Sequence, residues 1–346
     1  MPNAAPSFPS QNPPPRAVQA DPPVPPLEEA RSLDSVQPGG GFCFGLEAAW
    51  GRWRRRWLRR IRPGYVTRME KARQGRCERC PHDVIDARDL KLVRNGCGYW
   101  FREEDDRFRW RSQLRLARAG LAEVVFSSVL CLAVGLPLGL AATVQGGWPL
   151  WLATAVVAGL WFQLVWFFRD PPRAIPDDPS ALVSPSDGVV THLDEVDAKG
   201  FPGDRAFRVS IYLSPFDVHL NRIPRDAKVV SVRYFRGRFL NARRPDCVQR
   251  NEQLWTDFVE PNGRPLRVKQ ISGALARRLV CWLKLDEQVR MGDRYGMIKY
   301  GSRTEVLLPT QEALELAVRV GQRVNAGSTV LLRFTGNGDG RGERRA

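Results

Sequence analysis

The longest uninterrupted apolar pattern in the chain covers residues 124–168, where no Asp, Glu, Lys or Arg occurs. Two runs within it, 124–144 and 148–168, are each long enough to cross a hydrocarbon core of roughly 30 Å as an α-helix. A turn signal, Gln145-Gly146-Gly147, separates them. The pattern therefore predicts an N-terminal α-helical membrane hairpin over residues 120–168, and a re-entrant hairpin within one leaflet is the alternative. Arginines flank both outer ends, so we expect both ends on the cytoplasmic side.

From residue 177 the pattern changes to short runs of β-branched and aromatic residues separated by turn signals such as Asn262-Gly263. Runs of this kind are typical of β-strands. They predict a mainly β domain behind the hairpin, a compact barrel or sandwich, and residues 320–330 resemble the closing hairpin of barrel-sandwich domains. The expected strands are 188–193, 207–213, 228–235, 254–258, 266–271, 278–283, 296–300 and 304–308.

The residues before the hairpin divide into two parts. Residues 1–40 are rich in proline and poor in aromatic residues, so we expect a disordered tail. Residues 41–119 hold a basic amphipathic helix at 45–62 and a polar, cysteine-containing insert at 71–112. The helix carries Trp50, Trp53 and Trp57 among arginines, which suits a helix lying on a membrane surface. A solvated basic helix packed on the protein is an equally good interpretation.

The seven cysteines show no disulfide-like framework, which favours a reducing compartment. Within the insert, Cys77, Cys80, His82 and Cys97 are residue types that bind structural zinc. Only one tight Cys-x-x-Cys pair is present, however, so we favour a reduced cysteine set and expect no metal.

The formal net charge of +16 requires an anionic partner or surface. We find no nucleic-acid-reading module in the sequence and expect no nucleic acid as partner. Polybasic stretches beside a membrane segment are attracted to anionic lipid head groups. The charge therefore strengthens the membrane prediction.

One dipeptide, Gly301-Ser302, is a candidate site of self-cleavage. Gly301-Ser302 lies between two predicted strands, where a strained turn would let the Ser302 hydroxyl attack the Gly301 carbonyl. Elimination from the resulting ester would cut the chain and leave a pyruvoyl ketone on the new N-terminus. A Gly-Ser pair is also an ordinary turn dipeptide, and Gly327-Ser328 illustrates that second interpretation.

The surroundings of Gly301-Ser302 resemble the processing site of phosphatidylserine decarboxylase proenzymes, in which a Gly-Ser pair follows a Phe/Tyr-Gly-x-Ile-x-Phe/Tyr strand. Further motifs occur in the family's order, and the resemblance covers about residues 165–335. They are Phe167-Phe-Arg-Asp-Pro-Pro-Arg-Ala-Ile-Pro176, Val183-Ser-Pro-Ser-Asp187-Gly188, Leu213-Ser-Pro-Phe-Asp-Val-His219-Leu-Asn-Arg-Ile-Pro224 and Gln270-Ile-Ser-Gly-Ala-Leu-Ala-Arg-Arg-Leu-Val280.

The resemblance implies a pyruvoyl decarboxylase domain at 169–336, cleaved after Gly301, and a flexible tail at 337–346. It implies a relay in which Asp187 orients His219, His219 takes the hydroxyl proton, and Ser302 becomes the covalent pyruvoyl cofactor that binds substrate as a Schiff base. Longer relatives carry a second histidine in the His219 loop. Here that position is Arg222, so His219 is expected to act in processing, in later proton transfer, or in both.

By the same resemblance, the substrate is phosphatidylserine in an anionic membrane and the products are phosphatidylethanolamine and carbon dioxide. The two cleavage fragments are expected to stay associated, with the catalytic domain facing the cytoplasm, and homo-oligomerisation stays open. Two alternatives are a non-enzymatic, membrane-anchored β-domain that binds anionic lipid and a decarboxylase of a related phosphoserine-headed lipid.

Overall fold

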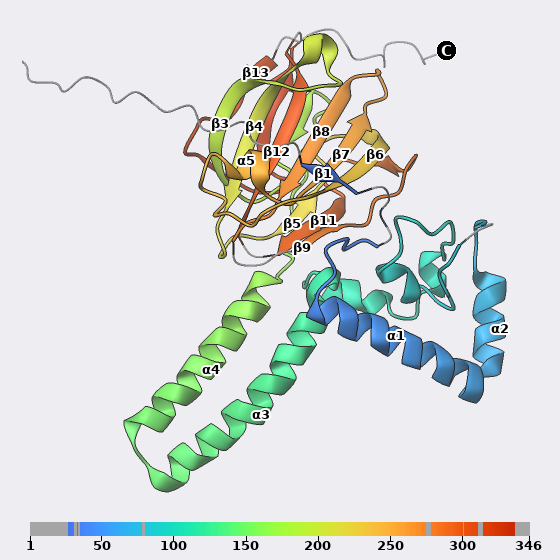
Figure 1. The fold of residues 1–346 in the computed structure, drawn as a ribbon, viewed down its shortest axis with the longest axis vertical. Helices are drawn as coiled ribbons and strands as arrows, with labels where there is room; N and C mark the ends of the chain where they lie inside the picture. The colour runs from blue at the N-terminus through green and yellow to red at the C-terminus, as the bar shows by residue number, and fades with distance from the viewer. Residues whose placement is uncertain are drawn as a thin grey trace, which may run out of the picture.

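The computed structural model describes residues 27–335 except 31, 32, 34, 78, 79, 275–277, 300 and 311–313. The predicted tail at 337–346 and most of the tail at 1–40 lie outside the described residues. Figure 1 shows three parts, which are a β-domain, a pair of long helices projecting from it, and a smaller N-terminal part beside the base of that pair.

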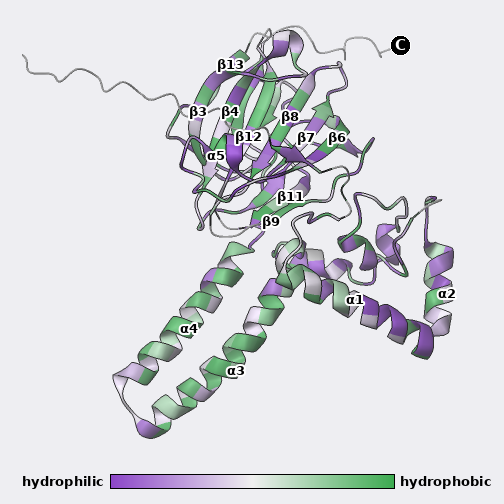
Figure 2. Ribbon diagram, in the orientation of Figure 1, coloured by the Kyte–Doolittle hydropathy of each residue, from purple (hydrophilic) through white to green (hydrophobic). Residues whose placement is uncertain are grey.

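The long helices are α3 (Leu121–Gln145) and α4 (Trp148–Phe167), which run antiparallel across the predicted glycine turn. Both are long and apolar enough to cross a membrane, and Figure 2 shows their hydrophobic colouring along most of their length. Their side chains face outward for the most part, and Trp161 Nε1 donates a hydrogen bond to Ser128 Oγ between the two helices. The predicted pair of apolar helices is confirmed.

The domain after the helices is mainly β, as predicted, and its sheets are antiparallel. Its largest sheet has nine strands in the order β1-β6-β7-β8-β12-β4-β3-β14, with β10 also paired to β6. Two three-stranded sheets have the orders β5-β11-β9 and β13-β15-β2. The strands are β1 (Glu28–Glu29), β2 (Ala181–Val183), β3 (Gly188–Asp197), β4 (Arg205–Leu213), β5 (Leu220–Arg222), β6 (Ala227–Arg236), β7 (Gln253–Val259), β8 (Pro265–Ile271), β9 (Arg278–Cys281), β10 (Gln288–Val289), β11 (Arg294–Lys299), β12 (Ser302–Pro309), β13 (Leu314–Leu316), β14 (Arg323–Val324) and β15 (Val330–Phe334).

All three sheets contribute to one core. Val209 from β4, Ile298 from β11 and Leu332 from β15 are fully buried in the same hydrophobic cluster. In β7, Leu254 and Phe258 are buried in the same cluster, because side chains four residues apart on a strand lie on one face. Each of the eight predicted strands overlaps an observed strand, although β9 ends at Cys281 and residue 300 lies outside the described residues.

The N-terminal part contains α1 (Phe42–Ile61) and α2 (Pro63–Ala72), which are separated at the X-Pro step before Pro63. The rest of this part has no other α-helix in its described residues, and its short 3₁₀ turns are Asp89–Lys91, Glu103–Asp105, Arg109–Leu114 and Arg118–Gly120. The β-domain adds the short helix α5 (Cys247–Arg250) and the 3₁₀ turn Pro202–Asp204.

Helix α1 has two distinct faces. Its buried face packs Leu58 against the insert, where Arg55 Nη1 donates to Asp89 Oδ1 over 2.8 Å. Its other face is an exposed apolar stripe at helical spacing, which consists of Phe42, Leu46, Trp50, Trp53, Trp57 and Ile61. The helix is therefore packed on the insert, as the second interpretation expects, while its tryptophans are exposed, as a membrane-surface helix requires.

Candidate active site

The Gly301-Ser302 pair joins two sheets. β11 ends at Lys299 in a three-stranded sheet, and β12 begins at Ser302 in the centre of the large sheet. Ser302 pairs in register with Leu213 of β4, so its backbone is held by a central strand. Gly301 lies between the sheets with φ +61°, in the left-handed region that glycine adopts without steric cost. The predicted cleavage site, the bond between Gly301 and Ser302, therefore lies where the chain passes from one sheet to the other.

His219 lies beside this junction. It directly precedes β5, whose neighbour is β11, and its carbonyl accepts the Ile298 N–H over 3.2 Å. The imidazole Nε2 accepts the backbone N–H of Gly301 over 3.2 Å. Nδ1 lies 2.8 Å from the carbonyl oxygen of Asp217, which assigns the proton to Nδ1 and leaves the lone pair on Nε2.

Burial determines the charge of this imidazole. His219 is fully buried, with the Phe167 ring 4.3 Å away between centroids. Desolvation and, less strongly, Arg169 lower the pKa of His219 and Asp217 opposes them, with the result that the pKa is lowered to about 4. The side chain is therefore a neutral base at neutral pH, with its acceptor nitrogen directed at the Gly301 amide.

The Ser302 hydroxyl is fully buried and has no hydrogen-bond partner among the described residues. A buried polar group without a partner costs about 1–3 kcal/mol. The hydroxyls of Ser186 and Ser272 share this property, so the neighbouring imidazole and carbonyl are what distinguish Ser302.

The Gly301 carbonyl is enclosed by a second glycine. A Cβ placed on Gly273 would lie 1.8 Å from the Gly301 oxygen and 2.8 Å from its carbonyl carbon. Only glycine at position 273 leaves room for this carbonyl. The backbone after β8 therefore fixes the group that Ser302 would attack.

Asp187 has partners other than His219. Its carboxylate accepts hydrogen bonds from Arg173 Nη2, over 2.6 and 2.8 Å, and from the Ala326 N–H over 2.8 Å. Burial raises the pKa of Asp187, although Ala326 and Arg173 both oppose the shift. Within the described part of the chain, no hydrogen bond joins Asp187 to His219, whose Nδ1 is oriented by the Asp217 carbonyl.

Arg222, which replaces the second histidine of longer relatives, is a structural residue here. Its guanidinium is buried and donates to the Gly292 carbonyl over 2.9 Å and to Asp170 Oδ1 over 3.2 Å. Burial lowers the pKa of Arg222, as does the neighbouring Arg294. These contacts bind β5 to the segment that follows α4.

Buried side-chain amides connect the motif segments 183–188, 213–224 and 270–280 with one another. Gln270 Nε2 donates to Asn221 Oδ1 over 2.7 Å, and Asn221 Nδ2 lies 3.4 Å from both the Pro185 carbonyl and Thr304 Oγ1. The network therefore joins the Asp187 loop, the His219 strand, β8 and β12 in one place.

The base of the helical pair also reaches this site. Lys299 forms an ion pair with Glu123 of α3, and Phe167 of α4 packs on His219. Two cavities of about 470 and 480 Å³ lie elsewhere on the molecule, and neither is lined by Gly301, Ser302 or His219. The junction is thus enclosed by the sheet and by the ends of the helices.

Several of these site residues were not predicted as functional. Arg173 and Phe167 lie in the motif that begins at Phe167, and Gly273 lies in the motif that begins at Gln270. The motifs therefore identified the chain segments that form the site, but they did not predict which side chains in those segments contact one another. The other histidines lie apart, as expected, because His192 Nδ1 contacts Thr191 Oγ1 in β3 and His82 lies in the insert.

Comparison with known proteins gives a consistent result. A family model described as "Phosphatidylserine decarboxylase" matches residues 162–332. A "Phosphatidylserine decarboxylase proenzyme" of Rhodopirellula baltica is 40% identical over 247 residues, which are 71% of this chain and 99% of the relative. Proteins of the same description from Symbiobacterium thermophilum and Desulfotalea psychrophila are 43% identical over 184 residues and 40% identical over 167 residues. These matches cover 53% and 48% of this chain and 85% and 77% of the relatives.

Proposed function

Because this chain belongs to the phosphatidylserine decarboxylase family, we propose that it converts phosphatidylserine into phosphatidylethanolamine and carbon dioxide. We propose further that it does so with a pyruvoyl group made from Ser302. One observation carries the proposal: an unpartnered, buried Ser302 hydroxyl follows a glycine whose amide contacts the neutral imidazole of His219.

Self-cleavage begins with a proton transfer. His219 takes the hydroxyl proton of Ser302, and Oγ attacks the Gly301 carbonyl carbon, which Gly273 holds in place. The amide C–N bond breaks as the C–O ester bond forms, leaving a free amine on Ser302. Loss of the Cα proton then expels the Gly301 carboxylate, and hydrolysis releases ammonia and leaves a ketone. This use of a base and a serine nucleophile follows the logic of serine hydrolases.

The surroundings of Ser302 fit such a group. The position is buried, rigidly held by β12, and free of competing hydrogen bonds in the described part of the chain. A pyruvoyl ketone at this position would supply an electrophile for the substrate amine and an electron sink for the breaking carboxylate bond. His219 is our candidate proton donor to the decarboxylated carbon, and its Nε2 atom, which holds a lone pair in the neutral imidazole, must first take up a proton for that role.

Asp187 supports this site in our proposal through charge and loop position. Its ion pair with Arg173 holds the segment after α4 against the turn that includes Ala326. The role of Asp187 in the self-cleavage relay stays a proposal, and its carboxylate contacts Arg173 and Ala326 instead of His219.

The two fragments should stay associated after cleavage. The small fragment begins with β12, which is paired along its length with β4 and β8 of the large fragment. β15 of the small fragment also pairs with β2 of the large one. The three sheets around one core support a barrel-sandwich domain over residues 169–336. Such a domain should tolerate a cut in the connection between β11 and β12.

The helical pair supports a membrane hairpin at 120–168 with the catalytic domain on the cytoplasmic side. Figure 1 shows α1 at the base of this hairpin, and Phe42 of its apolar stripe contacts Phe126 of α3 with ring centroids 5.7 Å apart. The stripe is thus continuous with the apolar hairpin surface. We infer that α1 lies in the head-group layer, where its tryptophans and arginines match the interface.

The test is a direct assay of the detergent-solubilised full chain on phosphatidylserine in mixed micelles, with released carbon dioxide and the lipid product measured. The fragment that begins at residue 302 should be lighter than its serine form by the mass of ammonia and should resist Edman degradation. An intact chain that still decarboxylates would exclude the pyruvoyl chemistry. A cleaved chain that leaves phosphatidylserine unchanged would exclude the substrate.

A further inference from the structure

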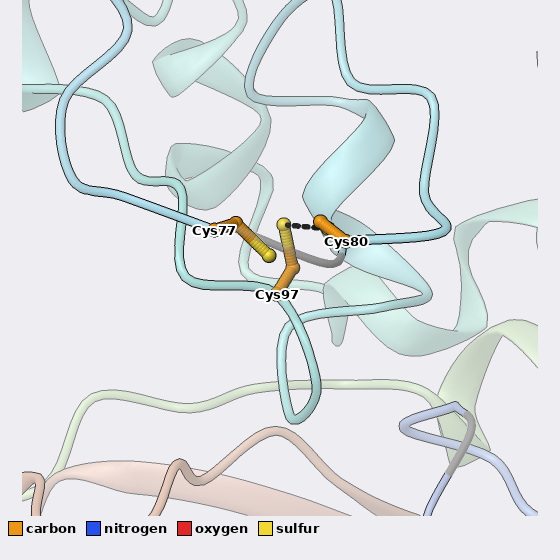
Figure 3. Close-up of side chains that lie close together, drawn as sticks. All are labelled: Cys77, Cys80 and Cys97. Atoms are coloured by element: carbon orange, nitrogen blue, oxygen red, sulfur yellow. Dashed lines mark hydrogen bonds between the residues drawn. The ribbon is translucent and has the colours of Figure 1, made fainter.

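Three cysteines of the N-terminal insert converge in space. The sulfur atoms of Cys77, Cys80 and Cys97 all lie within 4.8 Å of one another, and Cys80 Sγ is 3.3 Å from Cys97 Sγ. Figure 3 shows the three side chains directed toward one point from two separate chain segments. Zn–S bonds of about 2.3 Å in a tetrahedron place sulfur atoms about 3.8 Å apart. The observed arrangement is close to that spacing.

The backbone around the sulfurs is built for close approach. Gln74 and Trp100 pair through two backbone hydrogen bonds of 2.9 and 3.0 Å, which bring the Cys77 and Cys97 segments together. A Cβ on Gly98 would lie 2.1 Å from the Arg76 oxygen, and a Cβ on Gly75 would lie 2.3 Å from the Gly98 oxygen.

The hydrophobic core of the insert is small, and its other contacts with α1 include ion pairs of Asp83, Asp86 and Asp89 with arginines. Its hydrophobic cluster has four buried members, of which only Ile85 lies in the insert beyond the helices. Between α2 and α3 the described residues form 3₁₀ turns and isolated bridges only. Short segments with so small a core usually require a disulfide or a metal for a defined structure.

We propose that Cys77, Cys80 and Cys97 bind a structural zinc ion as thiolates. This geometry reverses the preference that the sequence gave for a metal-free set. Cys97 is buried while Cys77 and Cys80 are partly exposed, so the fourth position is accessible. A water molecule would complete the tetrahedron, since the His82 imidazole lies near Gly96 but is not among the ligand atoms that converge.

The zinc site would fasten the insert to the catalytic domain. Lys284 Nζ donates to the Cys97 carbonyl over 2.7 Å, and Asn95 Nδ2 donates to the carbonyls of Cys281 and Leu283 over 2.9 and 2.7 Å. Cys281 ends β9, which pairs with β11, the strand that leads to Gly301. The metal therefore stabilises the surface on which the processing strand rests.

The first experiment measures metal in the full chain, purified in detergent without chelator or affinity metal. About one zinc ion per chain is expected, and Cys77→Ser and Cys97→Ser should each abolish its retention. Cys131→Ser, which changes a cysteine of α3, is the matched control and should keep the metal.

A second readout works on the unmutated protein. With zinc bound, Cys77, Cys80 and Cys97 should resist alkylation until a chelator is added, whereas labelling of Cys131 should not depend on the chelator. Two results would overturn the proposal. One is a reduced protein that takes up no zinc from added zinc sulfate, and the other is a Cys80–Cys97 disulfide in cells alkylated before lysis.

Discussion

The chain contains two Gly-Ser pairs, and their surroundings differ. Both glycines have left-handed φ angles, +61° at Gly301 and +74° at Gly327. Gly327-Ser328 lies in a tight turn, in which the N–H groups of Ser328 and Thr329 donate to the Asn325 carbonyl over 3.2 and 3.0 Å. Local hydrogen bonds therefore form this turn, and the Gly327 N–H donates to the Ser184 carbonyl over 2.8 Å.

The first pair differs in the group that its amide contacts. The Gly301 N–H donates to the imidazole of His219, and the Ser302 hydroxyl is buried without a partner in the described chain. The Gly327 N–H donates to a backbone carbonyl instead, and the side chains nearest to Gly327 are those of Arg222 and Ile175, neither of which is a base. A Gly-Ser dipeptide alone therefore does not predict self-cleavage. The neighbouring base, His219, and the burial of Ser302 distinguish the first pair.

The largest expected effect comes from exchanging the two serines for alanine. Ser302→Ala should stay a single uncut chain without decarboxylase activity, because the nucleophile is gone. Ser328→Ala should be cut and active like the unmodified protein. Intact mass spectrometry of both variants measures the difference. Cleavage of Ser302→Ala between residues 301 and 302 would contradict the proposed chemistry.

Removing the base should have the next largest effect. His219→Gln keeps an acceptor for the Gly301 amide but cannot take the hydroxyl proton at neutral pH. Cleavage should slow by about 10²–10⁴-fold, the usual contribution of a general base. A time course after cell-free synthesis measures this rate, with His192→Gln as the control. Equal rates in the two variants would assign the proton transfer to another group.

Crowding the scissile carbonyl should have a smaller effect. Gly273→Ala introduces a Cβ that would lie 1.8 Å from the Gly301 oxygen, so the carbonyl must shift. Overpacking of this kind costs about 1–3 kcal/mol. If that energy destabilises the transition state for cleavage, the cleavage rate should fall roughly 10- to 100-fold. Gly64→Ala in α2, where a Cβ meets nothing within 4 Å, is the matched control. Normal cleavage of Gly273→Ala would show that the carbonyl position is not critical.

The smallest effect is expected from mild acidification. Because the His219 pKa is lowered to about 4, its imidazole stays neutral at pH 5 and cleavage should fall by only about a tenth. An ordinary histidine with a pKa near 6.5 would instead lose most of its base form. The fold itself loses stability as pH falls from about 6.5 to about 4, since the unfolded state binds the proton first. A cleavage rate that drops steeply between pH 7 and 5 would contradict the burial argument.

Local patterns predicted much of this molecule. The uncharged run at 124–168 predicted α3 and α4, and alternation of apolar residues predicted the strands on either side of Gly301. The sequence motifs also identified the segments that carry Asp187 and His219. These features depend on neighbours within a few residues, so they can be read along the chain.

Contacts between distant segments were not predictable in the same way. The hydrogen bonds of Asp187 to Arg173 and Ala326, the approach of Gly273 to Gly301, and the convergence of Cys77 and Cys97 all depend on the finished fold. Residue spacing gives no information on such distances. The relay from Asp187 to His219 stays a prediction for the same reason.

The position of Ser302 as the first residue of a central strand has a consequence for biogenesis. A register slip of one residue in β12 would turn every side chain of that strand to the opposite face. Ser302 would then leave its enclosure beside His219, and the proposed cleavage would not occur. A chain with misaligned strands would thus remain without a cofactor. On the proposed chemistry, the cut acts as a folding checkpoint, and only correctly assembled molecules gain catalytic activity.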